Sequence, residues 1–183
     1  FASSCVQLTY DDQYIFKKEG EIDFDDINLS KRTKYYLGHV QAPTSAQRKW
    51  TYETSHPFDT MSFMVFHNGV LTNEDALRNR YFPYIENPVD TSLIVNLIQK
   101  FMEEDRGKGN NPVRYIRQAL EECQGSFAVS IVDCDTNGGV SGANIRAITA
   151  NDDGSIDTSA LADWFKEPDT CYTIPRGMDT VTE

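Results

Sequence analysis

The sequence predicts an α+β domain in which helices stack on antiparallel sheets. Segments of strand composition come first, two segments with apolar residues at helical spacing follow, and strands then return. The chain has 183 residues, of which 39% are hydrophobic, and this length suits one domain with a sizeable core. We therefore expect a single domain over residues 1–166 and an extended polar tail over 167–183.

The first part of the chain is predicted to form strands. Four segments there have strand composition and are bounded by polar residues: Cys5–Thr9, Gln13–Lys17, 34–40 and 62–66. The first two flank a polar turn, which is typical of a hairpin. The last is a nearly continuous apolar run that stops at His67, which predicts a strand buried on both faces and ending there. The polar stretch 44–55 is expected to be a long loop, a common place for function.

The middle of the chain is predicted to form helices. Thr72 or Asn73 is expected to cap a helix that runs to Arg80. Asp90 should lie near the start of a second helix, because an apolar stripe at helical spacing follows it: Leu93, Ile94, Leu97, Ile98 and Phe101.

A third helix and the returning strands complete the expected domain. Pro112 is a favoured first residue of a helix, and Gly125 is expected to end this one. Residues 126–132 read as another buried strand, joined by a turn at 137–139 to a strand over 140–150. Residues 157–166 are expected to form a short helix.

Composition excludes several classes of protein. The net charge is −11 and the pI about 4.7, and no basic stripe is present, which argues against nucleic-acid binding. No apolar run approaches the roughly 20 residues that span a bilayer, so no membrane segment is expected. The four cysteines are widely spaced, which predicts free thiols in a reducing compartment and no zinc cluster. We expect no metal and no cofactor.

Three motifs stand where predicted strands end or helices begin: residues 38–44, His67-Asn68-Gly69 and Asp90-Thr91. Each has an ordinary structural interpretation. Asn-Gly after a strand is most often a turn, Asp before a helix is most often an N-cap, and a histidine at a strand end usually has a structural role.

The order of these motifs, together with His-Pro-Phe at 56–58 and Gly-Ser-Phe-Ala-Val at 125–129, resembles the glutaminase domain of class II glutamine amidotransferases. These are N-terminal-nucleophile hydrolases, and the likeness covers roughly residues 2–133. The resemblance implies a four-layer αββα sandwich of two antiparallel sheets. It also implies hydrolysis of glutamine to glutamate and ammonia by an N-terminal cysteine that uses its own α-amino group as base.

The resemblance assigns roles to five residues. Asn68 and Gly69 fall on the oxyanion hole, and Asp90 falls on the carboxylate that holds the α-ammonium group of glutamine. Thr44 falls on the pocket wall. Gln41 stands where the family has an arginine that grips the α-carboxylate bidentately. A second expectation is that Arg48 or Lys49 of the following loop supplies that charge instead.

The sequence departs from the family pattern at Gln41 and, in addition, at the nucleophile. The chain starts at Phe1 without an initiator methionine, so we expect a processed chain or a piece of a longer one. By alignment Cys5 replaces a glycine and is not the nucleophile. The first strand and helix of the family domain are expected to be missing from this chain.

Three functions follow as hypotheses. The first is a pseudoenzyme: a catalytically inactive structural or interaction module that contacts other protein chains of a larger assembly, such as a processed virion. Its location would be the cytoplasm or a virus particle. The second is an active glutamine amidotransferase whose cysteine segment lies on a separate piece. The third is a binding module for glutamine or a similar small molecule.

Overall fold

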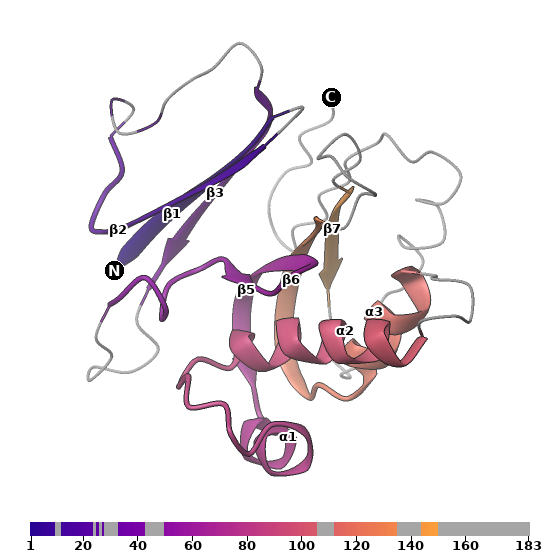
Figure 1. Cartoon of the computed structure of the whole chain (residues 1–183). Coiled ribbons are helices and arrows are strands. Elements are labelled where there is room, and N and C mark those ends of the chain that lie inside the picture. Colours follow the sequence, from indigo (N-terminus) through magenta and orange to yellow (C-terminus); the bar gives the residue numbers. More distant parts are fainter. Residues whose placement is uncertain are drawn as a thin grey trace.

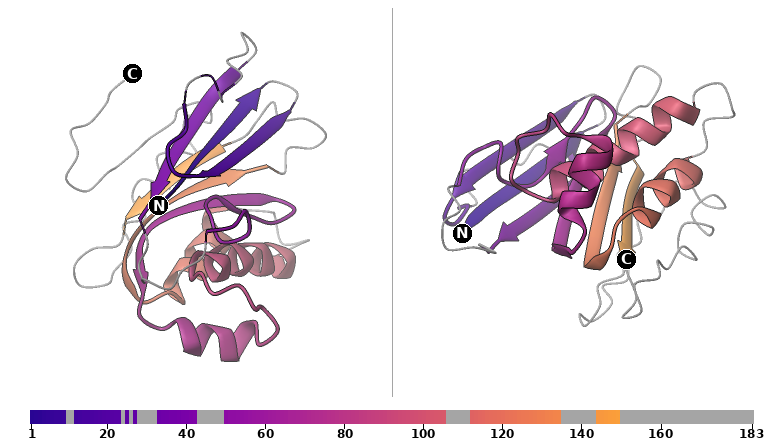
Figure 2. Two further views of the ribbon diagram at one scale, coloured as in Figure 1. Left: turned by 90° about the vertical axis from the view of Figure 1, so that its left-hand side faces the viewer. Right: turned by 90° about the horizontal axis from the view of Figure 1, so that it is seen from below.

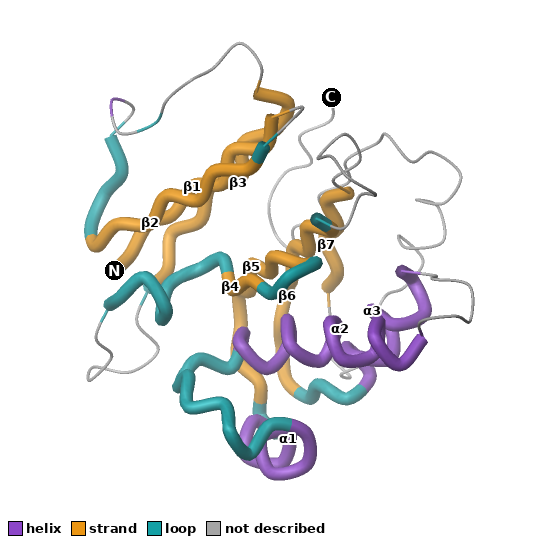
Figure 3. The backbone as a smooth tube through the Cα atoms, viewed as in Figure 1, coloured by secondary structure: helices purple, strands orange, loops and turns teal. Residues whose placement is uncertain are grey.

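The computed structural model describes residues 1–9, 12–23, 25, 27, 33–42, 50–105, 112–134 and 144–149. Strands, then helices, then strands follow one another as predicted (Figures 1 and 3). In chain order the elements are β1 (Ala2–Thr9), β2 (Gln13–Glu19), β3 (Thr33–Gln41), β4 (Phe58–Asp59), β5 (Phe63–Leu71), α1 (Glu74–Tyr81), α2 (Thr91–Asp105), α3 (Pro112–Glu121), β6 (Gly125–Asp133) and β7 (Asn144–Thr149).

The strands form two antiparallel sheets with the orders β2-β1-β3 and β4-β5-β6-β7. The predicted hairpin of β1 and β2 is confirmed, with Ala2 opposite Glu19 and Leu8 opposite Gln13. The two sheets lie one against the other (Figure 2) and pack through the apolar side chains of alternate residues. This interface contains Val6, Leu8, Met64, Phe66 and Val132. The predicted α+β class is therefore confirmed.

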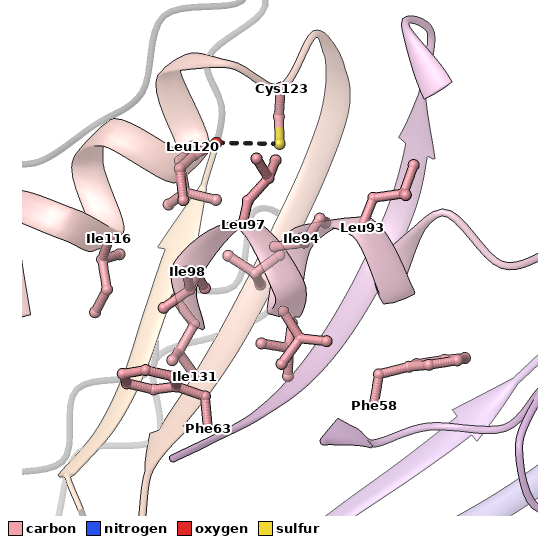
Figure 4. Close-up of a cluster of buried hydrophobic side chains, with 14 of the residues drawn as sticks. Phe58, Phe63, Leu93, Ile94, Leu97, Ile98, Ile116, Leu120, Cys123 and Ile131 are labelled. Atoms are coloured by element: carbon pink, nitrogen blue, oxygen red, sulfur yellow. Dashed lines mark hydrogen bonds between the residues drawn. The ribbon is translucent and has the colours of Figure 1, made fainter. Parts of the chain in front are cut away.

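Helices α2 and α3 cover the face of the second sheet that points away from the first (Figures 1 and 4). The stripe predicted from the sequence is buried against β5 and β6: Leu93, Ile94, Leu97 and Ile98 have no exposed surface, and Phe101 packs at the margin. Each such aliphatic side chain stabilises the fold by about 1.5–3 kcal/mol. This core fixes the N-terminus of α2 beside β5, where the candidate site lies.

Two predicted boundaries are wrong. Strand β5 does not end at His67 but continues to Leu71, and Asn68 and Gly69 pair with Ala128 and Phe127 of β6. The apolar run stopped because β5 leaves the core there, while its hydrogen-bond ladder continues. Helix α3 ends at Glu121, and Gly125 is the first residue of β6.

Asn73 occupies the predicted cap position of α1, but its side chain makes no capping hydrogen bond. Its amide instead binds the backbone of the segment before β6. Nδ2 donates to the Glu122 carbonyl at 2.8 Å, and Oδ1 accepts from the Gln124 N–H at 2.9 Å. The side chain thus joins the start of α1 to the connection between α3 and β6.

Several predictions lie outside the described residues: Thr44, Cys171, the turn at 137–139, the helix at 157–166 and the tail at 167–183. Within the described part, the last strand covers 144–149 of the predicted 140–150. The three cysteines described there, Cys5, Cys123 and Cys134, are free thiols. No helix among the described residues is long and apolar enough to cross a membrane.

Candidate functional site

The three histidines of the chain gather in one place. His39 comes from β3, His56 from the loop before β4, and His67 from β5. The ring centroids of His39 and His56 are 4.4 Å apart, and those of His56 and His67 are 6.5 Å apart. His56 and His67 are buried. The cluster therefore joins the two sheets at the N-terminus of α2.

A continuous hydrogen-bonded chain runs through this cluster from Gln41 to Asp90. Nδ1 of His56 lies 2.8 Å from Oε1 of Gln41, and Nε2 of His56 lies 3.0 Å from the Thr91 hydroxyl. The same hydroxyl lies 3.0 Å from Nδ1 of His67, which is 3.4 Å from Oδ1 of Asp90. Gln41 and Asp90, which the resemblance assigned to substrate binding, are thus linked through three residues to which it assigned no role.

The partners fix the direction of each hydrogen bond when the histidines are neutral. The backbone N–H of His56 donates to Oε1 of Gln41 at 3.1 Å, so this oxygen is an acceptor and Nδ1 of His56 must carry a proton. Nε2 of His56 then accepts from the Thr91 hydroxyl, because this contact of 3.0 Å is shorter than the 3.5 Å from the same hydroxyl to Oδ1 of Asp90. That hydroxyl has only one proton, so it accepts from Nδ1 of His67. Both rings are therefore Nδ1–H tautomers.

Asp90 lies directly before α2 and has a side chain that is 16% exposed. Its Oδ2 accepts a hydrogen bond from the Leu71 N–H at 3.0 Å. Burial acts to raise the pKa of this carboxyl, but the hydrogen bond from His67, its charge interaction and the N–H groups of Leu71 and Thr91 outweigh burial and lower the pKa. Asp90 is therefore an anion whose acceptors are largely used within the protein.

Gln41, the last residue of β3, is also engaged internally. Its side chain is buried, its oxygen accepts two hydrogen bonds from His56, and its Nε2 donates to the Thr54 carbonyl at 3.4 Å. A neutral amide whose oxygen and nitrogen are both hydrogen-bonded within the protein offers no positive charge to a ligand carboxylate.

Asn68 and Gly69 lie on an exposed part of β5. Successive strand residues point to opposite faces, so Asn68 shares the face of Met64 and Phe66, whereas His67 shares the face of Val65 and contacts Asp90. Within the described part of the chain no hydrogen bond or ion pair joins Asn68 to Asp90.

Gly69 has a steric reason to be glycine. Its φ is +141°, and a Cβ there would collide with the Ser126 carbonyl oxygen and lie 2.6 Å from Cα of Phe127. The backbone of β6 approaches this position closely, which only glycine permits.

The structure also shows what sequence reasoning missed. His56 and Thr91 belong to motifs that the sequence displays, His-Pro-Phe and Asp-Thr-Ser, but nothing in their spacing indicated that one hydroxyl joins two imidazoles. Lys17, which anchors the His56 loop, stands in a strand without any motif.

Comparison with known proteins shows what this arrangement resembles. No protein-family model matches the chain. Glutamine–fructose-6-phosphate aminotransferase (isomerizing) of Halalkalibacterium halodurans is 24% identical over 124 residues, which are 66% of this chain and 20% of that protein. The enzyme of the same name from Streptococcus pyogenes is 33% identical over 103 residues, which are 54% of this chain and 16% of that protein. The matched part of the chain therefore spans about a fifth or less of the length of these curated relatives.

The homologues of this chain are class II glutamine amidotransferases. Solved structures agree on the fold. Glutamine phosphoribosylpyrophosphate amidotransferase from B. subtilis, complexed with ADP and GMP, matches 87% of this chain and 32% of that chain with a TM-score of 0.57 at 21% identity. An allosteric regulatory enzyme of purine biosynthesis matches 85% of this chain and 42% of that chain with a TM-score of 0.56 at 18% identity. The chain is thus a glutamine amidotransferase-like domain with the N-terminal-nucleophile hydrolase fold.

Proposed function

We propose that this amidotransferase-like domain is a non-catalytic module that works through contacts with other protein chains and does not hydrolyse glutamine. One observation carries the proposal: Gln41 is neutral, buried and bound to His56, and by the resemblance it stands where the family has its carboxylate-gripping arginine. A charged hydrogen bond is worth about 1.5–3 kcal/mol, so its loss weakens glutamine binding by roughly 10- to 150-fold.

The state of Asp90 supports the same conclusion. Its carboxylate is already bound by the Leu71 N–H and lies 3.4 Å from His67. An incoming ammonium group would have to compete with these internal donors. Both residues that would orient an amino acid by resemblance are therefore held by the protein itself.

The test uses the full-length protein with its native N-terminus, so that any nucleophile encoded there is present. We expect no ammonia release from glutamine above a buffer blank, and no saturation in a calorimetric titration with millimolar glutamine. The Asn68→Ala variant should behave identically, and assembly with other chains, measured as native mass, should not change. Asn96→Ala is the matched control, because among the described residues its amide binds the Ser92 carbonyl on its own helix, α2.

An active glutaminase is the second candidate, favoured by Asn68 and Gly69, which remain exposed on β5. Ammonia release that Asn68→Ala abolishes and Asn96→Ala spares would establish it and refute our proposal. Saturable glutamine binding without ammonia release would instead identify a binding module.

A further inference from the structure

Side chains from other parts of the chain bind the loop that carries His56, residues 51–57. The Asn87 side chain donates to the Glu53 carbonyl at 2.8 Å, and Gln41 donates to the Thr54 carbonyl. Lys17 of β2 binds three further carbonyls, which makes it the principal anchor. Thr51, Thr54 and Ser55 also form hydrogen bonds within the loop, all of them before His56.

The ammonium group of Lys17 sits in a cage of backbone oxygens. Nζ donates to the carbonyls of Tyr52, Ser55 and Pro57 at 2.9, 2.9 and 2.8 Å. It also lies 4.1 Å from the centroid of the Tyr52 ring, within the range of a cation–π interaction. All three N–H donors of the ammonium are thus used, and Lys17 is half-buried.

Two of the carbonyls that Lys17 binds belong to the residues directly before and after His56 in the sequence. Holding Ser55 and Pro57 sets the course of the backbone at His56. It thereby directs the His56 N–H and ring toward Gln41 and the ring's far nitrogen toward Thr91. Lys17 of β2 is therefore connected to His56 through the two residues next to it in the chain.

We propose that Lys17 is the positioning residue for His56: its ammonium fixes the His56 loop so that the imidazole stays in the Nδ1–H tautomer between Gln41 and Thr91. Burial lowers the pKa of Lys17 to about 8, although the carboxylates of Asp59 and Glu53 oppose this shift. The proposal rests on these contacts alone and holds whether or not the domain hydrolyses glutamine.

The experiment compares three variants of the full chain. Lys17→Met keeps an unbranched apolar stem without donors, and Lys17→Ala also leaves space for n-propylammonium, which matches the atoms removed. Lys18→Met is the control, since Lys18 is the next residue on β2 and points to the other face of the sheet. The readouts are the His56 tautomer, from long-range ¹⁵N–¹H NMR couplings, and the exchange rate of the His56 amide.

In Lys17→Met we expect a mixture of His56 tautomers and exchange of the His56 amide about tenfold faster, as for the loss of one hydrogen bond. Lys18→Met should match the wild type. Propylammonium should restore the single tautomer in Lys17→Ala with saturation, whereas 1-propanol, of the same length without charge, should not.

A wild-type tautomer in Lys17→Met would overturn the proposal, as would equal rescue by 1-propanol. If neither variant folds even with propylammonium, Lys17 contributes to global stability and the positioning role is rejected. Because glutamine is absent from every measurement, these outcomes are separate from those that decide the catalytic question.

Discussion

Replacing Thr91 with valine keeps the shape of the side chain and removes the hydroxyl that joins His56 to His67. The residue is 1% exposed, so water cannot replace the lost group. The hydroxyl's hydrogen bonds to the two rings are each worth about 0.5–1.5 kcal/mol, and a buried group left unpaired costs about 1–3 kcal/mol. His56 loses its Nε2 partner, whereas Nδ1 of His67 keeps Asp90 at 3.4 Å. We therefore expect destabilisation by about 2–3 kcal/mol.

The assay is equilibrium unfolding in urea, followed by tryptophan fluorescence. With an m-value of about 2 kcal/mol/M, the midpoint should fall by about 1–1.5 M at unchanged m. Thr91→Ser is the matched control, because it keeps the hydroxyl and loses one methyl group, at a cost of about 1 kcal/mol. If the valine variant is no less stable than the serine variant, the hydroxyl does not join the histidines as described.

Two further predictions concern the same region. Burial lowers the pKa of His39, which a hydrogen bond to the His67 backbone only partly opposes; the unfolded chain therefore binds more protons, and stability should fall as the pH drops below about 6.5. His39→Gln, which keeps a donor but cannot titrate, should show a weaker loss of urea midpoint between pH 7.5 and 5.5, and an equal loss would contradict the assignment. Gly69→Ala should destabilise by more than about 2 kcal/mol, because its Cβ meets the backbone of β6 and its φ is positive; Gly38→Ala, whose Cβ would meet nothing within 4 Å, is the control in the same denaturation experiment.

Most of the fold could be predicted because buried residues are apolar and recur in the sequence with the period of the helix or strand that they belong to. The stripe that begins at Leu93 and the apolar run before His67 identified α2 and β5, since each faces the core of the sandwich. The same apolar pattern predicted the wrong end for β5, because Asn68 to Val70 are exposed while the hydrogen-bond ladder with β6 continues. Periodicity reports which residues are buried, but backbone pairing does not depend on burial.

The candidate site was harder to predict because its contacts join distant segments. The motifs indicated Gln41 and Asp90, but the chain between them depends on one hydroxyl of Thr91 that reaches two rings from different elements. Lys17 carries no signal at all, since its role comes from three carbonyl oxygens and any residue supplies a carbonyl. Sequence patterns identify side chains, not the backbone groups that side chains bind.

The close approach at Gly69 also specifies how β5 and β6 pair. A slip of one residue would turn the apolar face of β5 toward the wrong layer, so alternation alone excludes it. A slip of two residues keeps every side chain on its face, but it would place His67 or Leu71 opposite Phe127, where the β6 backbone leaves no space for a Cβ. Gly125 imposes the same condition from the other strand, since a Cβ there would meet the carbonyl oxygen of Val70. The two glycines therefore exclude the misalignment that hydrophobic patterning permits, and they keep His67 opposite Val129.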